Sequence, residues 1–334
     1  MFKNLLRIFV ILVGFIFLLT PFSSQAAIPG SEGVTVSPPL TELTINKGET
    51  AKGIIKLTNP LAKIIELYTS TADFLPEGET GGQKFLAPIA ENRKFSAASW
   101  INVEQSKIAM TPEEVEEIGY TISVPKDAEP CGHYAVIFFN SQPPELEKDK
   151  SQVAIGSQVG ALFLINVPEA KEGECSPSGV AETFTAPWLN LKMPVNFLTR
   201  IYNNGLVHFK PIGEIKIKNW GGTVIDGIKF NEGGGNVLPQ SARRFDNKWE
   251  AKDFKWWQKI GRFKAELGLV YGQTGALKSL SSSVVFWVIP WWIFVILGLI
   301  IIFIIWLIVK WRKKKKHLES FQLKYKNGQR PILR

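Results

Sequence analysis

The sequence holds little histidine and cysteine, with three His and two Cys among 334 residues. His133 and His208 lie far apart, and neither has a second His or Cys at the spacing of a metal site. The chain also lacks a G-x-S-x-G nucleophile motif and a glycine-rich phosphate loop that leads from a strand into a helix. We therefore predict no catalytic residues, no metal site, no cofactor and no enzymatic activity.

Most of the chain has no excess of positive charge, although the formal net charge is +9. Residues 310–334 hold ten basic residues and one acid, so this tail alone carries +9. Lys3 and Arg7 add two more charges, which leaves about −2 for the body of the protein. This distribution excludes nucleic acid as a partner of the body, because that partner requires a basic surface.

The N-terminus has the order of a signal peptide. Lys3 and Arg7 precede the apolar run 8–19, and Ser24 and Ala26 stand at the −3 and −1 positions of a cleavage site. We predict cleavage after residue 26 and translocation of the region from residue 27 onward out of the cytoplasm. An uncleaved anchor or a buried helix is the alternative interpretation.

A long uncharged run near the C-terminus predicts a single transmembrane helix over 284–310, because about 20 apolar residues span a bilayer. Tryptophans flank the run as membrane-interface residues do, namely Trp287, Trp291, Trp292 and Trp311. A basic cluster then forms a topology signal, consisting of Arg312, Lys313, Lys314, Lys315 and Lys316. Positive residues stay on the cytoplasmic side. We therefore predict a plasma-membrane protein in contact with lipid, with its N-terminal side extracellular and residues 311–334 as a cytoplasmic tail.

Between these segments the sequence predicts short strands separated by Gly, Pro and Asn, without helical periodicity. The clearest are 50–59, 117–124, 133–140 and 159–167, followed by 195–202, 213–218, 223–230, 261–270 and 280–287. They are rich in β-branched and aromatic residues. The fold class that this pattern favours is all-β, with two tandem immunoglobulin-like β-sandwiches at 27–170 and 180–283, joined by a linker at 171–179.

Ordered short motifs along this region resemble the WxL-interacting protein family of bacterial surface proteins. In the first half they are Val36–Leu43, Gly48–Thr50, Asp73-Phe74, Trp100-Ile101, Val124-Pro125, Ala128, Pro130 and Gly132–Tyr134. In the second half they are Pro194–Phe197, Asn204-Gly205, His208, Pro211, Gly213, Val237–Pro239, Ser241, Arg243, Tyr271-Gly272 and Phe286–Trp291. The resemblance implies two immunoglobulin-like domains, a signal peptide, a membrane anchor, a peptidoglycan-binding first domain and partners that carry W-x-L motifs.

This sequence departs from the family pattern at Lys47, where Pro is usual, and at Cys131, where a second Gly is usual. None of its Trp residues begins a W-x-L tripeptide, so the resemblance implies the receiving partner.

Two aromatic pairs are candidate binding residues. His133 and Tyr134 start a strand, where the alternative for Tyr134 is a corner hydrogen bond to the backbone. Trp256 and Trp257 stand beside lysines and suit membrane or glycan contact, but a turn packed onto the end of the sandwich fits them equally. Adjacent residues of an extended segment face opposite ways, so one of these two Trp side chains is expected to be exposed. Trp100, Trp188 and Trp220 are expected in the core or at a domain junction.

Three functions remain open at this point. The main one is a membrane-anchored cell-surface protein that binds peptidoglycan, a cell-wall polymer, or another surface protein. The second is a structural spacer or assembly subunit of an envelope complex. The third is a chaperone-like protein that lends a strand to secreted subunits.

The two cysteines predict a disulfide between Cys131 and Cys175. Both lie in the translocated part, where an oxidising compartment keeps such a bond. Strands 133–140 and 159–167 are expected to be antiparallel neighbours, so the start of the first lies beside the end of the second. The bond would tie the linker to the first domain. Two unpaired thiols are the alternative.

Overall fold

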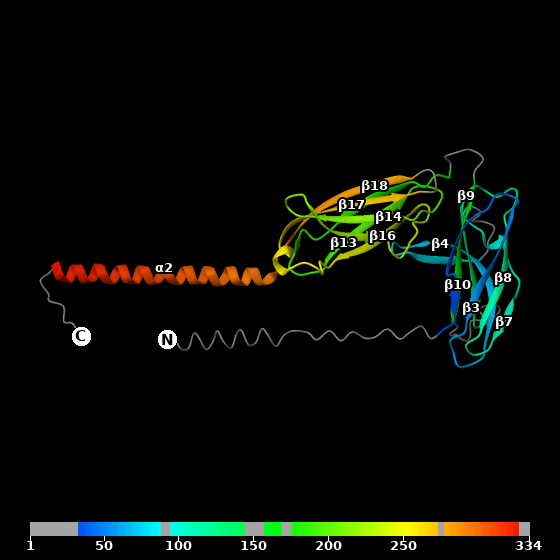
Figure 1. The fold of residues 1–334 in the computed structure, drawn as a ribbon, viewed down its shortest axis with the longest axis horizontal. Helices are drawn as coiled ribbons and strands as arrows, with labels where there is room; N and C mark the ends of the chain where they lie inside the picture. Colours follow the sequence, from blue (N-terminus) through cyan, green and yellow to red (C-terminus); the bar gives the residue numbers. More distant parts are fainter. Residues whose placement is uncertain (1–32, 88–93, 144–156, 169–174, 273–276, 327–334) are drawn as a thin grey trace.

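The computed structural model describes residues 33–87, 94–143, 157–168, 175–272 and 277–326, with side chains up to Lys315 (Figure 1). Strands make up most of the regular structure in these ranges, and one long helix comes after them. The predicted all-β class with one apolar C-terminal helix is therefore confirmed. The predicted signal peptide lies outside the described residues.

The first ten strands form two sheets that face each other, here called the first sandwich. One sheet has the order β1-β3-β8-β6, and these strands are Thr35–Ser37, Thr50–Thr58, Val115–Ser123 and Ile101–Val103. The other has the order β2-β10-β9-β4-β5, with β7 also paired to β4. Its strands are β2 Leu40–Thr44, β10 Gln158–Val167, β9 Cys131–Asn140, β4 Ile65–Glu77, β5 Gly82–Leu86 and β7 Lys107–Met110.

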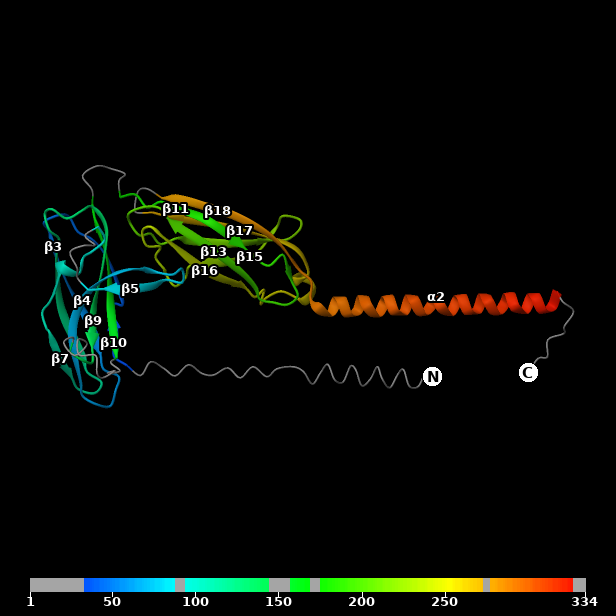
Figure 2. The ribbon, with the colours of Figure 1, turned by 180° about the vertical axis from the view of Figure 1, so that it is seen from behind.

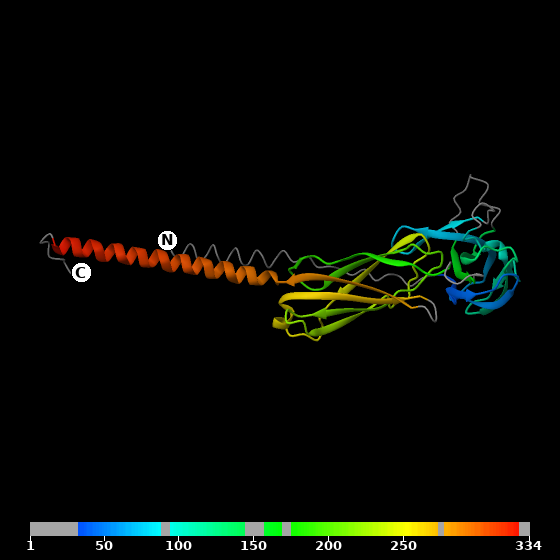
Figure 3. The ribbon, with the colours of Figure 1, turned by 90° about the horizontal axis from the view of Figure 1, so that it is seen from above.

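The next eight strands form the second sandwich, from a three-stranded and a five-stranded sheet. The smaller sheet is β11-β13-β16, at Gly179–Thr185, Val195–Asn203 and Ser241–Trp249. The larger is β12-β18-β17-β14-β15, at Leu189–Asn190, Lys278–Val288, Gly261–Tyr271, Ile212–Lys218 and Val224–Phe230. The second sandwich lies between the first sandwich and the helix (Figure 3).

Each sandwich has its own hydrophobic core, built by alternation along the strands. In β13, for example, Val195, Phe197, Thr199 and Ile201 are fully buried, while the alternate residues Asn196, Leu198 and Arg200 are more exposed. The cores contain residues from both facing sheets in each case. Burial of these apolar side chains is the main stabilising contribution to each sandwich.

Strand β9 differs, because both of its faces are buried. Ala135, Ile137 and Phe139 face the core of the first sandwich. The alternate residues Tyr134, Val136 and Phe138 belong to a separate cluster on the outer face of the sheet. That cluster includes Leu238 of the second sandwich, so the outer face of β9 forms part of the junction between the two sandwiches.

Helix α2 runs from Trp291 to Lys326, and its segment Trp291–Lys315 is long and apolar enough to cross a membrane. The helix starts later than the predicted residue 284, because β18 continues to Val288. Phe286 and Val288 lie in the core of the second sandwich, which keeps this stretch in the sheet. A soluble form of the protein that ends at residue 283 would therefore cut through β18.

The nine predicted strands match β3, β8, β9, β10, β13, β14, β15, β17 and β18 to within a few residues at each end. The remaining strands were not predicted from the sequence, among them the 13-residue β4 and the nine-residue β16. Both turn out to be central to the candidate site.

Candidate binding cleft between the two sandwiches

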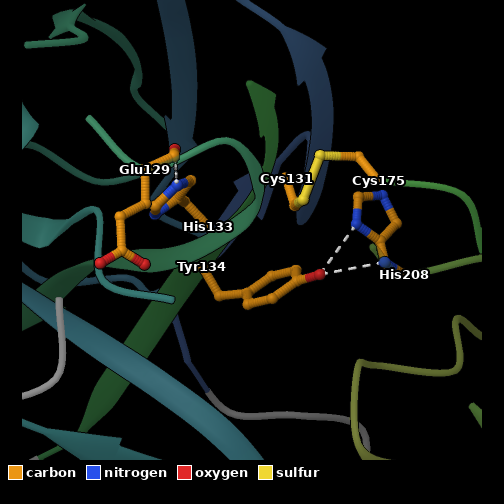
Figure 4. The surroundings of a disulfide bond; sticks show 6 residues. All are labelled: Glu129, Cys131, His133, Tyr134, Cys175 and His208. Carbon is orange, nitrogen blue, oxygen red and sulfur yellow. Dashed lines mark hydrogen bonds between the residues drawn. A yellow bond between two sulfur atoms is a disulfide. The ribbon is translucent and has the colours of Figure 1, made fainter. Parts of the chain in front are cut away.

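A disulfide and a hydrogen bond attach the start of β9 to residues at and beyond position 175. The pair predicted from the sequence, Cys131 and Cys175, is bonded in the structure, with Cα atoms 4.9 Å apart (Figure 4). Next to it the amide of Gly132 donates to the carbonyl of Leu206 at 3.0 Å. The first residues of β9 are therefore held by the second sandwich.

Tyr134 of the first sandwich also contacts the second sandwich. Its hydroxyl accepts a hydrogen bond from the backbone amide of His208 at 3.0 Å and lies 3.2 Å from Nδ1 of that residue (Figure 4). Burial lowers the pKa of His208 to about 4, and it raises the pKa of Tyr134. Both groups are therefore neutral at pH 7, and they connect the sandwiches without buried charge.

A charged cluster lies near this pair. Glu42 of β2 accepts from Nδ2 of Asn236 at 2.7 Å and from Nζ of Lys210 at 3.1 Å. Burial alone would raise the pKa of Glu42, but the hydrogen bonds from Asn236 and Lys210 and the charge of Lys210 lower it on balance. Glu42 therefore stays ionised and links the first sandwich to two loops of the second.

The β4–β5 hairpin reaches from the first sandwich to the small sheet of the second (Figure 2). At its turn, Glu79 accepts from Nε and Nη2 of Arg200 at 2.9 and 2.8 Å. Arg200 also pairs with Glu182. The backbone amide of Arg244 donates to the carbonyl of Glu79 at 2.6 Å. The hairpin is thus attached to both β13 and β16.

Between the hairpin and the loop before β16 lies a cleft with a volume of about 200 Å³. Its apolar residues are Leu40, Phe74, Pro76, Leu162, Leu164 and Leu238. Its polar side includes Gln83, Asn236, Ser241 and Arg243, and two glycine-rich turns complete it, with Gly78, Gly81 and Gly82 on one and Gly233, Gly234 and Gly235 on the other. Both sandwiches therefore contribute to one concave surface.

Arg243 is the charged residue of this cleft. Its Nη1 donates to the carbonyl of Asn236 at 2.8 Å, and its guanidinium lies close to Gly81 and Gly235. A Cβ at either glycine would come within 2.7 Å of Cζ of Arg243, so the two glycines make room for the guanidinium. None of the ion pairs in the described part of the chain includes Arg243, and burial lowers its pKa.

A second polar group at the cleft lacks a partner. Oδ1 of Asn236 is buried and accepts no hydrogen bond within the described residues. A buried polar atom without a partner costs free energy, about 1–3 kcal/mol. Arg243 gives the cleft a cation that no carboxylate pairs with among the described residues.

This arrangement suits an anionic group that is attached to a larger molecule. A guanidinium binds a carboxylate or phosphate through two parallel hydrogen bonds, and apolar walls strengthen the interaction by excluding water. The volume of about 200 Å³ is below the roughly 300–1,000 Å³ of small-molecule sites, so one end group of a larger ligand fits better than a whole cofactor.

The candidate binding residues from the sequence lie elsewhere. His133 and Tyr134 are buried, and neither lines the cleft at Arg243. The ring nitrogens of His133 face the carbonyls of Ser96 and Glu129, and Tyr134 bonds to the opposite sandwich instead of forming a corner within its own.

The exposed tryptophans also differ from expectation. Trp256 and Trp257 are both exposed, because they lie in a 3-10 turn, η4, at Trp256–Lys259 and not in an extended segment. Trp188 and Trp220 are exposed as well, although a position in the core or at a domain junction was expected for them. Trp100 is partly buried and contacts His133 in a tilted arrangement, with ring centroids 4.4 Å apart. Trp287 lies in β18, before the helix.

The sequence analysis did not identify the cleft residues as a site. Arg243 was one of the residues that carry the family resemblance, and three consecutive glycines precede it by a few positions. The available signal was a run of glycines before an arginine. It was not sufficient, because the strands β4 and β16, which were not predicted, supply residues that form the cleft. Within the described ranges, no group of three or more His, Cys, Asp and Glu residues is placed to hold a metal ion.

No protein-family model matches the chain, and no curated protein does. Among solved structures, a chain from a CFA/I fimbriae chaperone–tip adhesin complex is 14% identical, with a TM-score of 0.35, and the match covers 76% of this chain and 98% of that one. The class 5 fimbriae chaperone CfaA is 12% identical with a TM-score of 0.35, covering 76% and 99%. The E. coli chaperone DraB is 10% identical with a TM-score of 0.33, covering 75% and 97%. All three TM-scores are below 0.5, and they assign no function to this chain.

Proposed function

We propose that the chain is a membrane-anchored cell-surface protein whose two immunoglobulin-like domains bind an anionic group of the cell wall, such as a peptidoglycan carboxylate. The observation that carries the proposal is Arg243, a half-buried cation without an ion-pair partner among the described residues, in a cleft that both sandwiches form. Helix α2 supplies the anchor, since Trp291–Lys315 has the length and composition of a span.

The junction supports a binding role because it is braced at several points. The disulfide, the Tyr134–His208 pair and the bonds of Glu42 and Glu79 all connect the sandwiches. A site between two domains binds best when its halves are already in place, since ordering them on binding would reduce the affinity. The bracing therefore keeps the cleft in its binding geometry.

The test is sedimentation of the detergent-solubilised full chain with insoluble peptidoglycan. We expect retention that survives moderate salt, because one half-buried ion pair is screened much less than surface charges. A body of about −2 charge cannot be held by bulk electrostatics. Protein that stays in the supernatant at every salt concentration would contradict wall binding, and it would favour the structural spacer or a surface-protein ligand.

A second candidate function is pairing with a strand of a secreted subunit, as a chaperone does. The observation in its favour is the outer edge of β10. Strand β2 covers that edge only from Leu162 to Asn166, so within the described residues Gln158–Ala161 pairs with β9 alone. Capture of a secreted protein that is unaffected by substitution of Arg243 would favour this function over wall binding.

A further inference from the structure

The base of helix α2 is joined to the second sandwich without a free linker. Only Ile289 and Pro290 separate β18 from the helix. The amides of Trp287, Ile289 and Trp291 donate to the carbonyls of Trp188, Asn190 and Leu191 at 2.8, 3.0 and 3.2 Å. The end of the sandwich must therefore lie at the level where the apolar helix begins.

Exposed tryptophans gather at this same end. The tryptophan collar consists of Trp188, Trp220, Trp256, Trp257 and Trp291, whose side chains are 53–84% exposed. Strand register places Trp220 there, because Lys218 pairs opposite Lys264 while Gly261 pairs opposite Val288, at the helix.

Contacts within the collar tie it to the helix. The ring of Trp256 lies 5.5 Å from that of Trp292 and 5.6 Å from that of Trp257. Nζ of Lys255 lies 5.2 Å from the centroid of Trp257. Trp249, by contrast, is buried in the core of the second sandwich. Large aromatic side chains that are exposed together on one end of a sandwich indicate an interaction surface.

We propose that the collar is seated in the phospholipid headgroup layer of the bilayer that α2 crosses, so that the second sandwich rests on the membrane. The inference rests on the proposed function in one respect, the anchoring of the chain by α2. Tryptophan prefers this layer because its ring is amphipathic, and lysine beside it binds lipid phosphate. The collar lies at the end of the sandwich from which the apolar helix leaves, so lipid is the surface already present at that level.

The experiment uses the full chain reconstituted in phosphatidylcholine–phosphatidylglycerol vesicles, with and without lipids brominated near the headgroup end of the acyl chain. Bromine quenches tryptophan fluorescence at short range. The collar signal is the difference in fluorescence between wild type and a variant that combines Trp188→Phe, Trp220→Phe, Trp256→Phe and Trp257→Phe. The loss on Trp306→Phe reports the helix, and the loss on Trp100→Phe reports the first sandwich.

We expect brominated lipid to quench the collar signal and the Trp306 signal, and to leave the Trp100 signal unchanged. A quenched Trp306 with an unquenched collar would overturn the seating while leaving the anchor intact, and it would point to glycan or a second copy as the partner of the collar. If neither signal is quenched, both the seating and the membrane anchor are contradicted. The four substituted side chains are exposed, so the melting temperature of the variant should match that of wild type.

Discussion

At the scale of single residues, the contact between Tyr134 and His208 requires a neutral imidazole. The Tyr134 hydroxyl accepts from the His208 amide, so its own hydrogen is available to Nδ1. A protonated Nδ1 could no longer accept from the hydroxyl. It would donate to the same oxygen as the amide does, and the hydroxyl hydrogen would lose its acceptor. Burial and the charge of Lys210 disfavour protonation, while Glu42 opposes them in part.

We predict that the protein loses stability as the pH falls from about 6.5 towards 4. The pKa of His208 is about 4 in the folded chain and roughly 6.5 when unfolded, so the unfolded state binds more protons in this window. The expected loss at pH 5 relative to pH 7 is about 2 kcal/mol, measured by denaturant unfolding. Glu42, whose pKa is lowered on balance, also loses its stabilising contribution as the pH falls.

The matched variant is His208→Gln, which cannot titrate. His133 titrates in both proteins, so the difference between them isolates His208. A variant whose stability falls with pH as steeply as that of wild type would show that His208 is not the group responsible.

At the scale of elements, the disulfide joins the start of β9 to the segment that leads into the second sandwich. The two cysteines are 44 residues apart in sequence. A disulfide that closes a loop of this length lowers the entropy of the unfolded chain. In the chain-entropy model this raises the free energy of unfolding by about 4 kcal/mol. The bond also restrains the segment between the two sandwiches.

We predict that the double variant Cys131→Ser and Cys175→Ser unfolds at lower denaturant concentration, with a loss of up to about 4 kcal/mol. Limited proteolysis should then cut first near residue 175, because the connecting segment is no longer held. Wild type treated with a reductant is the parallel control. Equal stability of oxidised and reduced protein would contradict a bracing role for the bond.

The strands that sequence patterns predicted are those with continuous apolar or alternating residues, such as β9 and β13. Strand β16 was missed because its nine residues are mostly polar, with only Phe245 and Trp249 buried. Strand β4 was missed because polar residues and Pro76 interrupt its pattern, and it pairs with three different strands along its length.

The cleft could not be predicted for the same reason. Its walls come from segments far apart in sequence, the turn around Gly81 and the loop around Gly235, and only the paired sandwiches bring them together. The cysteine pair was predictable because adjacent antiparallel strands place their opposite ends side by side, as β9 and β10 do.

At the scale of the whole molecule, the first sandwich lies at the end of the second sandwich that is away from helix α2 (Figure 3). The cleft is formed between the two sandwiches at that end. We predict that protease added to intact cells removes both sandwiches and spares an epitope at Arg334. The prediction rests on the basic cluster after Trp311, because clusters of this kind usually stay on the cytoplasmic side. Protection of the sandwiches together with loss of the epitope would reverse the topology.

The most direct test of the binding account compares peptidoglycan retention of Arg243→Gln with that of Arg244→Gln. Both variants remove one positive charge from β16, but the Arg244 side chain is exposed and pairs with Asp246 outside the cleft. We expect Arg243→Gln to weaken retention by about tenfold to a hundredfold, the value of a hydrogen-bonded charge, and Arg244→Gln to leave it unchanged. Arg243→Lys should recover part of the loss, because the charge returns without the planar fork. Equal retention by all three variants, with unchanged melting temperatures, would contradict the assignment of the cleft as the binding site.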